Sequence, residues 1–126
     1  MTIQEAFEET QRMEPNTYTV EDMIGWLSQL DRKIWREVFM THEGIEKDAE
    51  FDGYTAATDP TTELLVKEPD AEDVYINYLK AMVNKNNMEI GKYNQNITAF
   101  NDAYNTFSSY YTRTHMPLQV LPHFLF

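Results

Sequence analysis

Residues 88–117, MEIGKYNQNITAFNDAYNTFSSYYTRTHMP, decide the fold of this chain. Their apolar and aromatic residues recur at alternating steps of three and four, so they form a stripe on one side of an α-helix: Ile90, Tyr93, Ile97, Phe100, Tyr104, Phe107 and Tyr111. Such a stripe, called the seam below, is not left in water. We therefore expect other segments of the chain to cover it, chiefly the helix predicted at 19–41.

Two helices are predicted before the seam. Residues 2–14 form the first, with Thr2 and Glu5 at the spacing of a capping box and Pro15 as its end. The second spans about 19–41, begins at Thr17 or Thr19, and ends before Gly44. The chain is thus expected to be all-α: a small helical bundle in a single domain, residues 1–126.

The segment before the seam has the same helical phase as the seam itself. Periodicity resumes at Val74 after Pro69 and runs without a break to Ile90 and beyond. This favours one long helix from about 71 to 113, because the phase would not survive a random loop. The polar residues at 84–87 and Gly91 are poor helix formers, so a kink or a break there is the alternative.

Two segments stand outside the helices. The connection 43–70, called the arm, holds nine Asp or Glu against two Lys, and a connection of this length is uncommon in a compact domain. We interpret it as a functional arm or a loop that orders against a neighbour, with candidate contact residues Glu50, Phe51, Asp52, Tyr54, Leu64, Leu65 and Val66; within it, the one apolar cluster, LLV at 64–66, fits a short extended segment laid over the helices. The extended tail 118–126 is mostly apolar and needs a cover; its docking residues are Leu118, Val120, Leu121, Phe124, Leu125 and Phe126.

Composition excludes several classes of protein. A hydrophobic fraction of 42% argues for a folded chain, and the absence of cysteine excludes disulfides and thiolate metal sites. The net charge of −11 disfavours attraction to nucleic acid or to an anionic membrane. There is no apolar run long enough for a membrane span, and the acidic start MTIQEAFEE is not a secretory signal.

Candidate chemistry is sparse. The loop that starts at Asp48 resembles the calcium-binding loop of an EF-hand, with Asp52 and Gly53 at its fifth and sixth positions and Asp59 at its twelfth. It departs from that loop because the third position is Glu50, the twelfth is Asp where an EF-hand has Glu, and Pro60 follows. A solvated acidic loop is therefore the simpler interpretation. The histidines form no i, i+4 pair for zinc, so His42, Arg113 and His115 are interpreted as helix-end contacts. No nucleophile or phosphate-binding motif occurs. We expect no enzyme activity, no metal and no cofactor.

Asparagine is unusually frequent near and within the last helix, at 84, 86, 87, 94, 96, 101 and 105. Asn favours caps and turns over helix interiors. A solvated polar face is the simpler interpretation, and a polar contact between helices or subunits, with Asn86 setting its register, is the alternative.

Four stretches together resemble a family of small proteins from siphophages and prophages of Gram-positive bacteria. They are THEG at 41–44, TELLV at 62–66 with Pro69 after it, YINYL at 75–79, and the ending FNDAYNTFSSYYTRTHMP. The likeness extends over nearly the whole chain from WLSQLD at 26–31 onward. The family is that of the head–tail connector, or adaptor, proteins.

The resemblance implies an all-helical virion structural protein at the neck, assembled in the host bacterial cytoplasm. Such subunits form a ring with themselves, typically a dodecamer, below the portal protein and above tail-side proteins. The genome passes through the ring without specific binding, and no membrane is involved. By this likeness the tail would dock on the portal and the arm would reach a neighbour or the tail side.

The charge of −11 leaves a second class open, an acidic DNA mimic or regulatory protein that inhibits a nucleic-acid enzyme. Against it, the acids concentrate in the arm and are not spread along a helical face. An enzyme or calcium binder would rest on the loop 48–59 alone.

Overall fold

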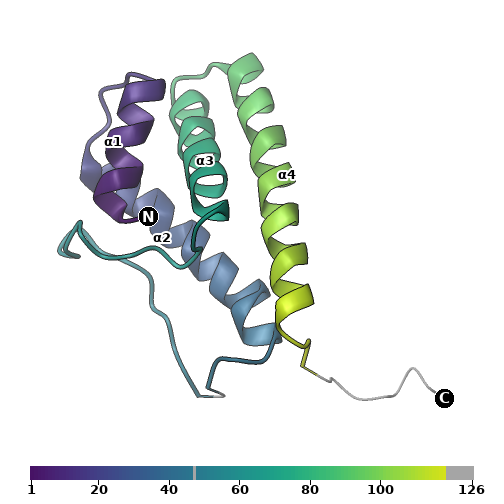
Figure 1. Cartoon of the computed structure of the whole chain (residues 1–126). Helices are drawn as coiled ribbons and strands as arrows, with labels where there is room; N and C mark the ends of the chain where they lie inside the picture. The colour runs from purple at the N-terminus through teal and green to yellow at the C-terminus, as the bar shows by residue number, and fades with distance from the viewer. Residues whose placement is uncertain (47, 119–126) are drawn as a thin grey trace.

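A computed structural model describes residues 1–46 and 48–118 and shows a small bundle of α-helices, which confirms the all-α prediction (Figure 1). The helices are α1 (Ile3–Met13), α2 (Val20–Glu37), α3 (Asp70–Asn86) and α4 (Ile90–Thr114), with a short 3₁₀ helix, η1 (Phe39–Thr41). α1, α3 and α4 stand side by side with α3 in the middle, and α2 runs diagonally across them. In the part of the chain described, β-type pairing is confined to two isolated bridges, Thr2–Glu63 and His42–Pro117.

The starts of the first two helices are fixed by local capping, as the sequence indicates. Thr2 Oγ1 accepts the Glu5 N–H at 3.1 Å, while the Glu5 carboxylate accepts the Thr2 N–H at 2.8 Å. Thr19 and Asp22 repeat this arrangement at the start of α2. Each box satisfies two backbone N–H groups that a helix start leaves without partners. Thr19, and not Thr17, therefore opens α2.

The continuous helix favoured for 71–113 is wrong, because α3 and α4 are separate helices that pack on each other (Figure 1). The chain turns at Met88, whose φ of 60° is left-handed, and the Glu89 N–H bonds the Asn84 carbonyl oxygen at 2.8 Å. The Asn84 side chain then donates to Asn96 Oδ1 across the two helices at 2.7 Å. A turn this short preserves the apolar phase, since both helices of such a hairpin face the same core.

The seam on α4 packs mainly on α3, so the prediction that the helix at 19–41 is its main cover is wrong, although Phe39, which lies in that predicted range as part of η1, does contact the seam. Tyr78 of α3 lies 5.2 Å from Phe100 between ring centroids, and Phe39 of η1 stacks on Tyr111 at 5.0 Å. The end of α2 reaches α4 at Tyr104, whose Oη donates to Glu37 at 3.0 Å and whose ring centroid lies 5.4 Å from Lys33 Nζ. The reason is the break at Met88, which places α3 directly against the seam.

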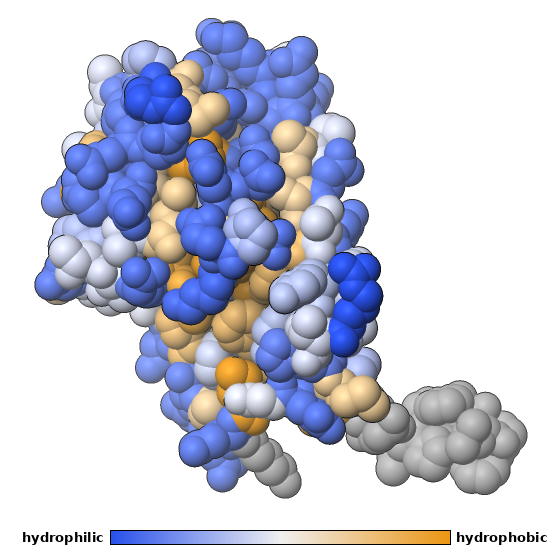
Figure 2. Space-filling model, viewed as in Figure 1, coloured by the Kyte–Doolittle hydropathy of each residue, from blue (hydrophilic) through white to orange (hydrophobic). Residues whose placement is uncertain are grey.

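The core lies between α2 and the row of α1, α3 and α4. α4 contributes Phe100 and Phe107, and the largest fully buried side chains come from α1, α2, α3 and the arm: Tyr75, Ile3, Met23, Ile24, Leu27, Leu30, Ile34, Leu64, Leu79, Val38, Val66 and Val74. A strip of apolar surface remains visible down the front of the molecule, between α1 and α4 (Figure 2). The arm thus contributes to the core and does not merely connect two helices.

Candidate functional site

The arm and the C-terminal segment leave the bundle together, at the end formed by η1 and the last turn of α4. Residues 41–43 and 116–118 lie antiparallel: the Glu43 N–H bonds the Met116 carbonyl oxygen at 2.9 Å, and the Leu118 N–H bonds the Thr41 carbonyl oxygen at 2.8 Å. Both segments are candidates for binding other proteins, so this end of the molecule is the candidate functional site.

His42 and His115 hold this end together through one tyrosine. His42 Nδ1 lies 2.7 Å from the Val38 carbonyl oxygen, so this nitrogen donates, and Nε2 faces Thr112 Oγ1 at 3.0 Å. The rings of His42 and His115 contact Tyr111, the first edge-on at 5.3 Å and the second stacked at 3.9 Å. Two of the predicted helix-end residues therefore meet across the junction of α2 and α4.

Arg113, the third predicted helix-end residue, lies apart from the two histidines. Its side chain is exposed beside Asn105 and Ser109 on α4. Gly44, by contrast, belongs to the junction: a Cβ atom at this position would lie 3.2 Å from His115 Cδ2, and its φ of +106° is left-handed. The conformation and the close approach together explain why glycine occupies position 44.

A hollow of about 390 Å³ adjoins this end, between the segment before α3 and the last turns of α4. Its apolar wall consists of Phe39, Leu65, Phe107, Tyr110 and Tyr111, and Lys67, Glu68 and Asp70 lie along its rim. Leu118 follows the junction and is 50% exposed. The other predicted docking residues, Val120, Leu121, Phe124, Leu125 and Phe126, lie outside the described part of the chain.

From Gly53 onward the arm packs against the chain's own helices, which confirms that the cluster at 64–66 lies over the helices and is contrary to the expectation that the arm orders against a neighbour. Tyr54, Leu64 and Val66 are buried in the core at 9%, 0% and 0% exposure, so they are not available as contacts between subunits. Phe51 and Leu65 are half-buried. Of the seven arm residues predicted as contacts, Glu50 and Asp52 are the two that remain exposed.

The arm is held close to α2 at Gly53. Its φ of +85° is left-handed, and an added Cβ would clash with Ser28 Oγ and lie 2.8 Å from Arg32 Cδ. The next residue bonds the same serine, since the Tyr54 N–H donates to Ser28 Oγ at 2.9 Å. The glycine that suggested position six of a calcium loop therefore allows the backbone to approach a helix.

The acidic residues of the loop 48–59 do not converge. Asp59 accepts the N–H and the hydroxyl of Thr61, both at 2.9 Å. Among residues 1–46 and 48–118, no three His, Asp or Glu side chains are placed to hold a metal ion. The geometry therefore gives the calcium interpretation no support.

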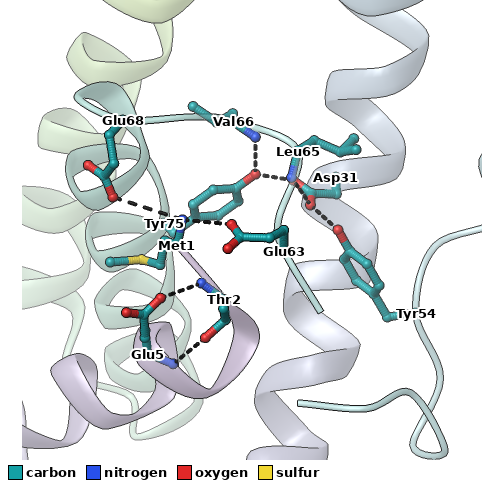
Figure 3. Close-up of polar contacts among 10 residues, drawn as sticks. All are labelled: Met1, Thr2, Glu5, Asp31, Tyr54, Glu63, Leu65, Val66, Glu68 and Tyr75. Carbon is teal, nitrogen blue, oxygen red and sulfur yellow. Dashed lines mark hydrogen bonds and ion pairs between the residues drawn. The ribbon is translucent and has the colours of Figure 1, made fainter. Parts of the chain in front are cut away.

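The main anchor of the arm is the carboxylate of Asp31, which is wholly buried (Figure 3). It accepts the Tyr75 hydroxyl at 2.6 Å on one oxygen, and the Tyr54 hydroxyl at 2.5 Å with the Leu65 N–H at 3.1 Å on the other. Tyr75 Oη in turn accepts the Val66 N–H at 2.8 Å. One side chain of α2 thereby fixes three arm residues and α3.

Burial is the largest influence on the pKa values of the groups in this network. It raises the pKa of Asp31 above its usual range, although the hydrogen bonds from Tyr54, Tyr75 and Leu65 oppose the rise. Burial and the nearby Asp31 charge raise the pKa of both tyrosines as well, so each hydroxyl remains a donor throughout the ordinary pH range. The network therefore has one titrating group near neutral pH or below, the carboxyl of Asp31.

The raised pKa of Asp31 predicts a pH dependence of stability. The folded state binds the Asp31 proton more tightly than the unfolded state, so this carboxyl stabilises most at low pH. Its contribution declines as pH rises from the unfolded value, about 3.9, through the higher folded pKa. We expect the free energy of unfolding of the wild type, minus that of Asp31→Asn, to fall with rising pH and then level off. Urea titrations from about pH 4 to about pH 8 measure it; a difference that grows with pH would mean that the hydrogen bonds outweigh burial.

The start of the chain is tied to the same part of the arm (Figure 3). The Ile3 N–H donates to the Thr62 carbonyl oxygen at 3.1 Å, and the Leu64 N–H donates to the Met1 carbonyl oxygen at 2.9 Å. The Met1 ammonium group lies 3.2 Å from Glu63 and 3.9 Å from Glu68. Residues 60–66 are therefore held from two sides, by α1 and by Asp31.

Sequence reasoning missed Asp31, although a signal was present. Asp31 falls between Leu27, Leu30 and Ile34 on the apolar face of α2, where an unpaired charge is costly. A carboxylate at such a position indicates buried donors elsewhere in the chain. Two of those donors are tyrosine hydroxyls, from the arm and from α3, and nothing local to Asp31 identifies them.

None of the helices described is long and apolar enough to cross a membrane. Comparisons with models of protein families, with curated protein sequences and with solved structures found no match to this chain.

Proposed function

We propose that this chain is a structural subunit of a phage head–tail connector ring, which joins the portal to tail-side proteins and leaves a channel for the genome. The resemblance in THEG at 41–44, TELLV at 62–66 and the ending at 100–117 suggests the family. The observation that carries the proposal is the junction at 41–43 and 116–118, where two segments leave a helical body side by side. A connector needs such segments to hold two different partners.

The tail and the arm take different roles in this proposal. The tail 118–126 docks on the portal, as its apolar side chains need a partner's surface. The first half of the arm, with Glu50 and Asp52 exposed, contacts a neighbouring subunit or the tail side. The net charge of −11 suits a ring around DNA, because acidic side chains repel phosphates and let the genome slide.

Deletion of 119–126 is expected to abolish attachment to the portal protein of the phage or prophage that encodes this chain. The deletion keeps Leu118, whose N–H bonds Thr41, so the junction and the helical content are unchanged. Co-sedimentation with portal rings measures attachment, and far-ultraviolet circular dichroism measures helicity. A truncated chain that binds portal as well as the full chain would refute the role of the tail.

A control variant of unchanged length shows whether the apolar side chains of the tail or only its length is needed for attachment. In it, Val120, Leu121, Phe124, Leu125 and Phe126 are all changed to Ser, which keeps the tail's length and removes its apolar side chains. This variant is expected to behave like the deletion. If it attaches normally, backbone contacts and not apolar burial hold the tail on the portal.

The alternative function, a DNA mimic, has one observation in its favour. Glu5, Glu8, Glu9 and Glu72 line a hollow of about 480 Å³ between α1 and α3. Arg12 lies in the same hollow and pairs with Glu9, which breaks up the run of negative charge that a mimic needs. A chain that ignores portal, stays monomeric and inhibits a nucleic-acid enzyme would favour the mimic over the connector.

A further inference from the structure

The charge of this chain is distributed unevenly between two opposite edges. Asp102 is the one acidic residue on α4 among the 21 of the chain, and from Ile90 to Asn101 the helix carries a single charge, Lys92. The other exposed polar side chains there are amides and one hydroxyl, Asn94, Gln95, Thr98 and Asn101, and Ile90 and Gly91 are exposed at the start of the helix. The amides of Asn94, Gln95 and Asn101 can donate hydrogen bonds to a partner, whereas the Thr98 hydroxyl already donates to the Asn94 carbonyl oxygen at 2.9 Å. The first half of α4 is therefore a donor-rich, weakly positive face on a strongly acidic protein.

The opposite edge has the complementary chemistry. Glu5 and Glu8 of α1 are exposed, and Glu72 at the start of α3 lies beside them along the hollow between the two helices. Carboxylates only accept hydrogen bonds. Arg12, the one base in that hollow, is occupied by Glu9. This edge therefore presents acceptors and negative charge where α4 presents donors.

The position of these faces suits contact between copies. α3 separates α1 from α4, so the two faces point away from each other, and α1 stands level with the first half of α4 (Figure 1). Both edges also carry exposed apolar side chains at the same end of the bundle. Met13 closes α1 and is 47% exposed, while Met88 and Ile90 at the start of α4 are 86% and 71% exposed. Two copies placed side by side would bring these side chains together.

We propose that the first half of α4 binds the α1 edge of a second copy of this chain. The contact joins two different faces, so each subunit keeps one face free for the next, and repetition closes into a ring if the rotation allows. It rests on the proposed ring function and specifies its subunit contact. The Lys92 side chain and the α4 amides meet the α1 glutamates, and Ile90 with Met88 covers Met13.

A charge exchange between the two faces tests this contact. In one variant, Lys92→Glu and Gln95→Glu make the α4 face acidic; in the other, Glu8→Lys and Glu72→Lys make the α1 edge basic. All four side chains are exposed, and all four are outside the hydrogen bonds and ion pairs found in residues 1–46 and 48–118. Each variant alone then opposes like charges, and self-association is expected to weaken about tenfold or more.

An equal mixture of the two variants is the decisive sample. Acidic α4 faces can then meet basic α1 edges, and native α4 faces can meet native α1 edges, so the mixture is expected to regain the association that each variant lost. Sedimentation velocity over a concentration series, at low salt to limit screening, measures the mass. Recovery in the mixture also shows that both variants are folded.

A matched control lies on the same helix. Ser109→Glu with Arg113→Glu makes the same change of charge near the other end of α4, and this variant is expected to associate like the wild type. The proposal is overturned if the mixture associates no better than its components, if the control is as damaging as the Lys92 variant, or if the wild type stays monomeric at millimolar concentration. Portal attachment is measured separately: a self-associating wild type that ignores portal refutes the connector function and leaves this contact standing.

Discussion

Replacing Asp31 with Ala is expected to destabilise the chain by about 3–5 kcal/mol, the usual cost of removing one member of a buried charged network. The loss leaves two tyrosine hydroxyls and the Leu65 N–H buried without their acceptor. Each such group costs roughly 1–3 kcal/mol when water cannot replace the lost partner. Urea denaturation followed by circular dichroism measures the change in the free energy of unfolding.

Exposed aspartates of the arm provide the control for Asp31. Asp52→Ala removes the same side chain from an exposed position and is expected to change stability by less than about 0.5 kcal/mol. Tyr54→Phe and Tyr75→Phe each remove one donor and should cost less than Asp31→Ala, since the carboxylate keeps its other hydrogen bonds. An Asp31→Ala variant as stable as Asp52→Ala would show that the arm is not anchored at this carboxylate.

Leu64→Ala is expected to cost about 2–5 kcal/mol, the range for shortening a fully buried leucine. Leu64 is 0% exposed, so the substitution leaves a cavity where the arm packs on the core, while the backbone N–H at position 64 can still bond the Met1 carbonyl oxygen. Hydrogen exchange should show protected amides at 64–66 in the wild-type monomer and faster exchange there in the variant.

Leu118→Ala is the matched control for Leu64→Ala, because it makes the same chemical change at a side chain that is 50% exposed. Its cost is expected to stay below about 0.5 kcal/mol. If the two variants are equally stable, or if the amides at 64–66 exchange freely in the wild type, the second half of the arm is not part of the folded core.

Features set by neighbouring residues could be predicted from the sequence. The capping boxes at Thr2 and Thr19 depend on side chains three residues away, and the seam depends on spacing within one helix. The turn at Met88 could not be predicted from phase, because a short hairpin and a straight helix place the apolar residues at the same intervals. The Asn-rich composition of 84–87 was the better signal, since Asn favours turns.

The arm illustrates the opposite limit. Its acidic, breaker-rich composition indicated an irregular segment, and it is irregular, but composition does not reveal which side chains are buried. Tyr54 and Leu65 are fixed by Asp31, which precedes them by 23 and 34 residues. Such long-range pairs depend on the packing of the whole bundle. Glu50 and Asp52 are exposed, as their charge indicates, and among residues 1–46 and 48–118 neither forms a long-range hydrogen bond that the sequence would have had to reveal.

The junction of 41–43 with 116–118 has a mechanical consequence. A force that pulls on the residues beyond Leu118 is resisted first by two backbone hydrogen bonds, those of Leu118 with Thr41 and of Glu43 with Met116. Because His42 bonds both the end of α2 and Thr112 of α4, the load is shared between two helices and does not unwind α4 from its last turn. The short pairing thus transfers tension on the C-terminal segment into the body of the bundle.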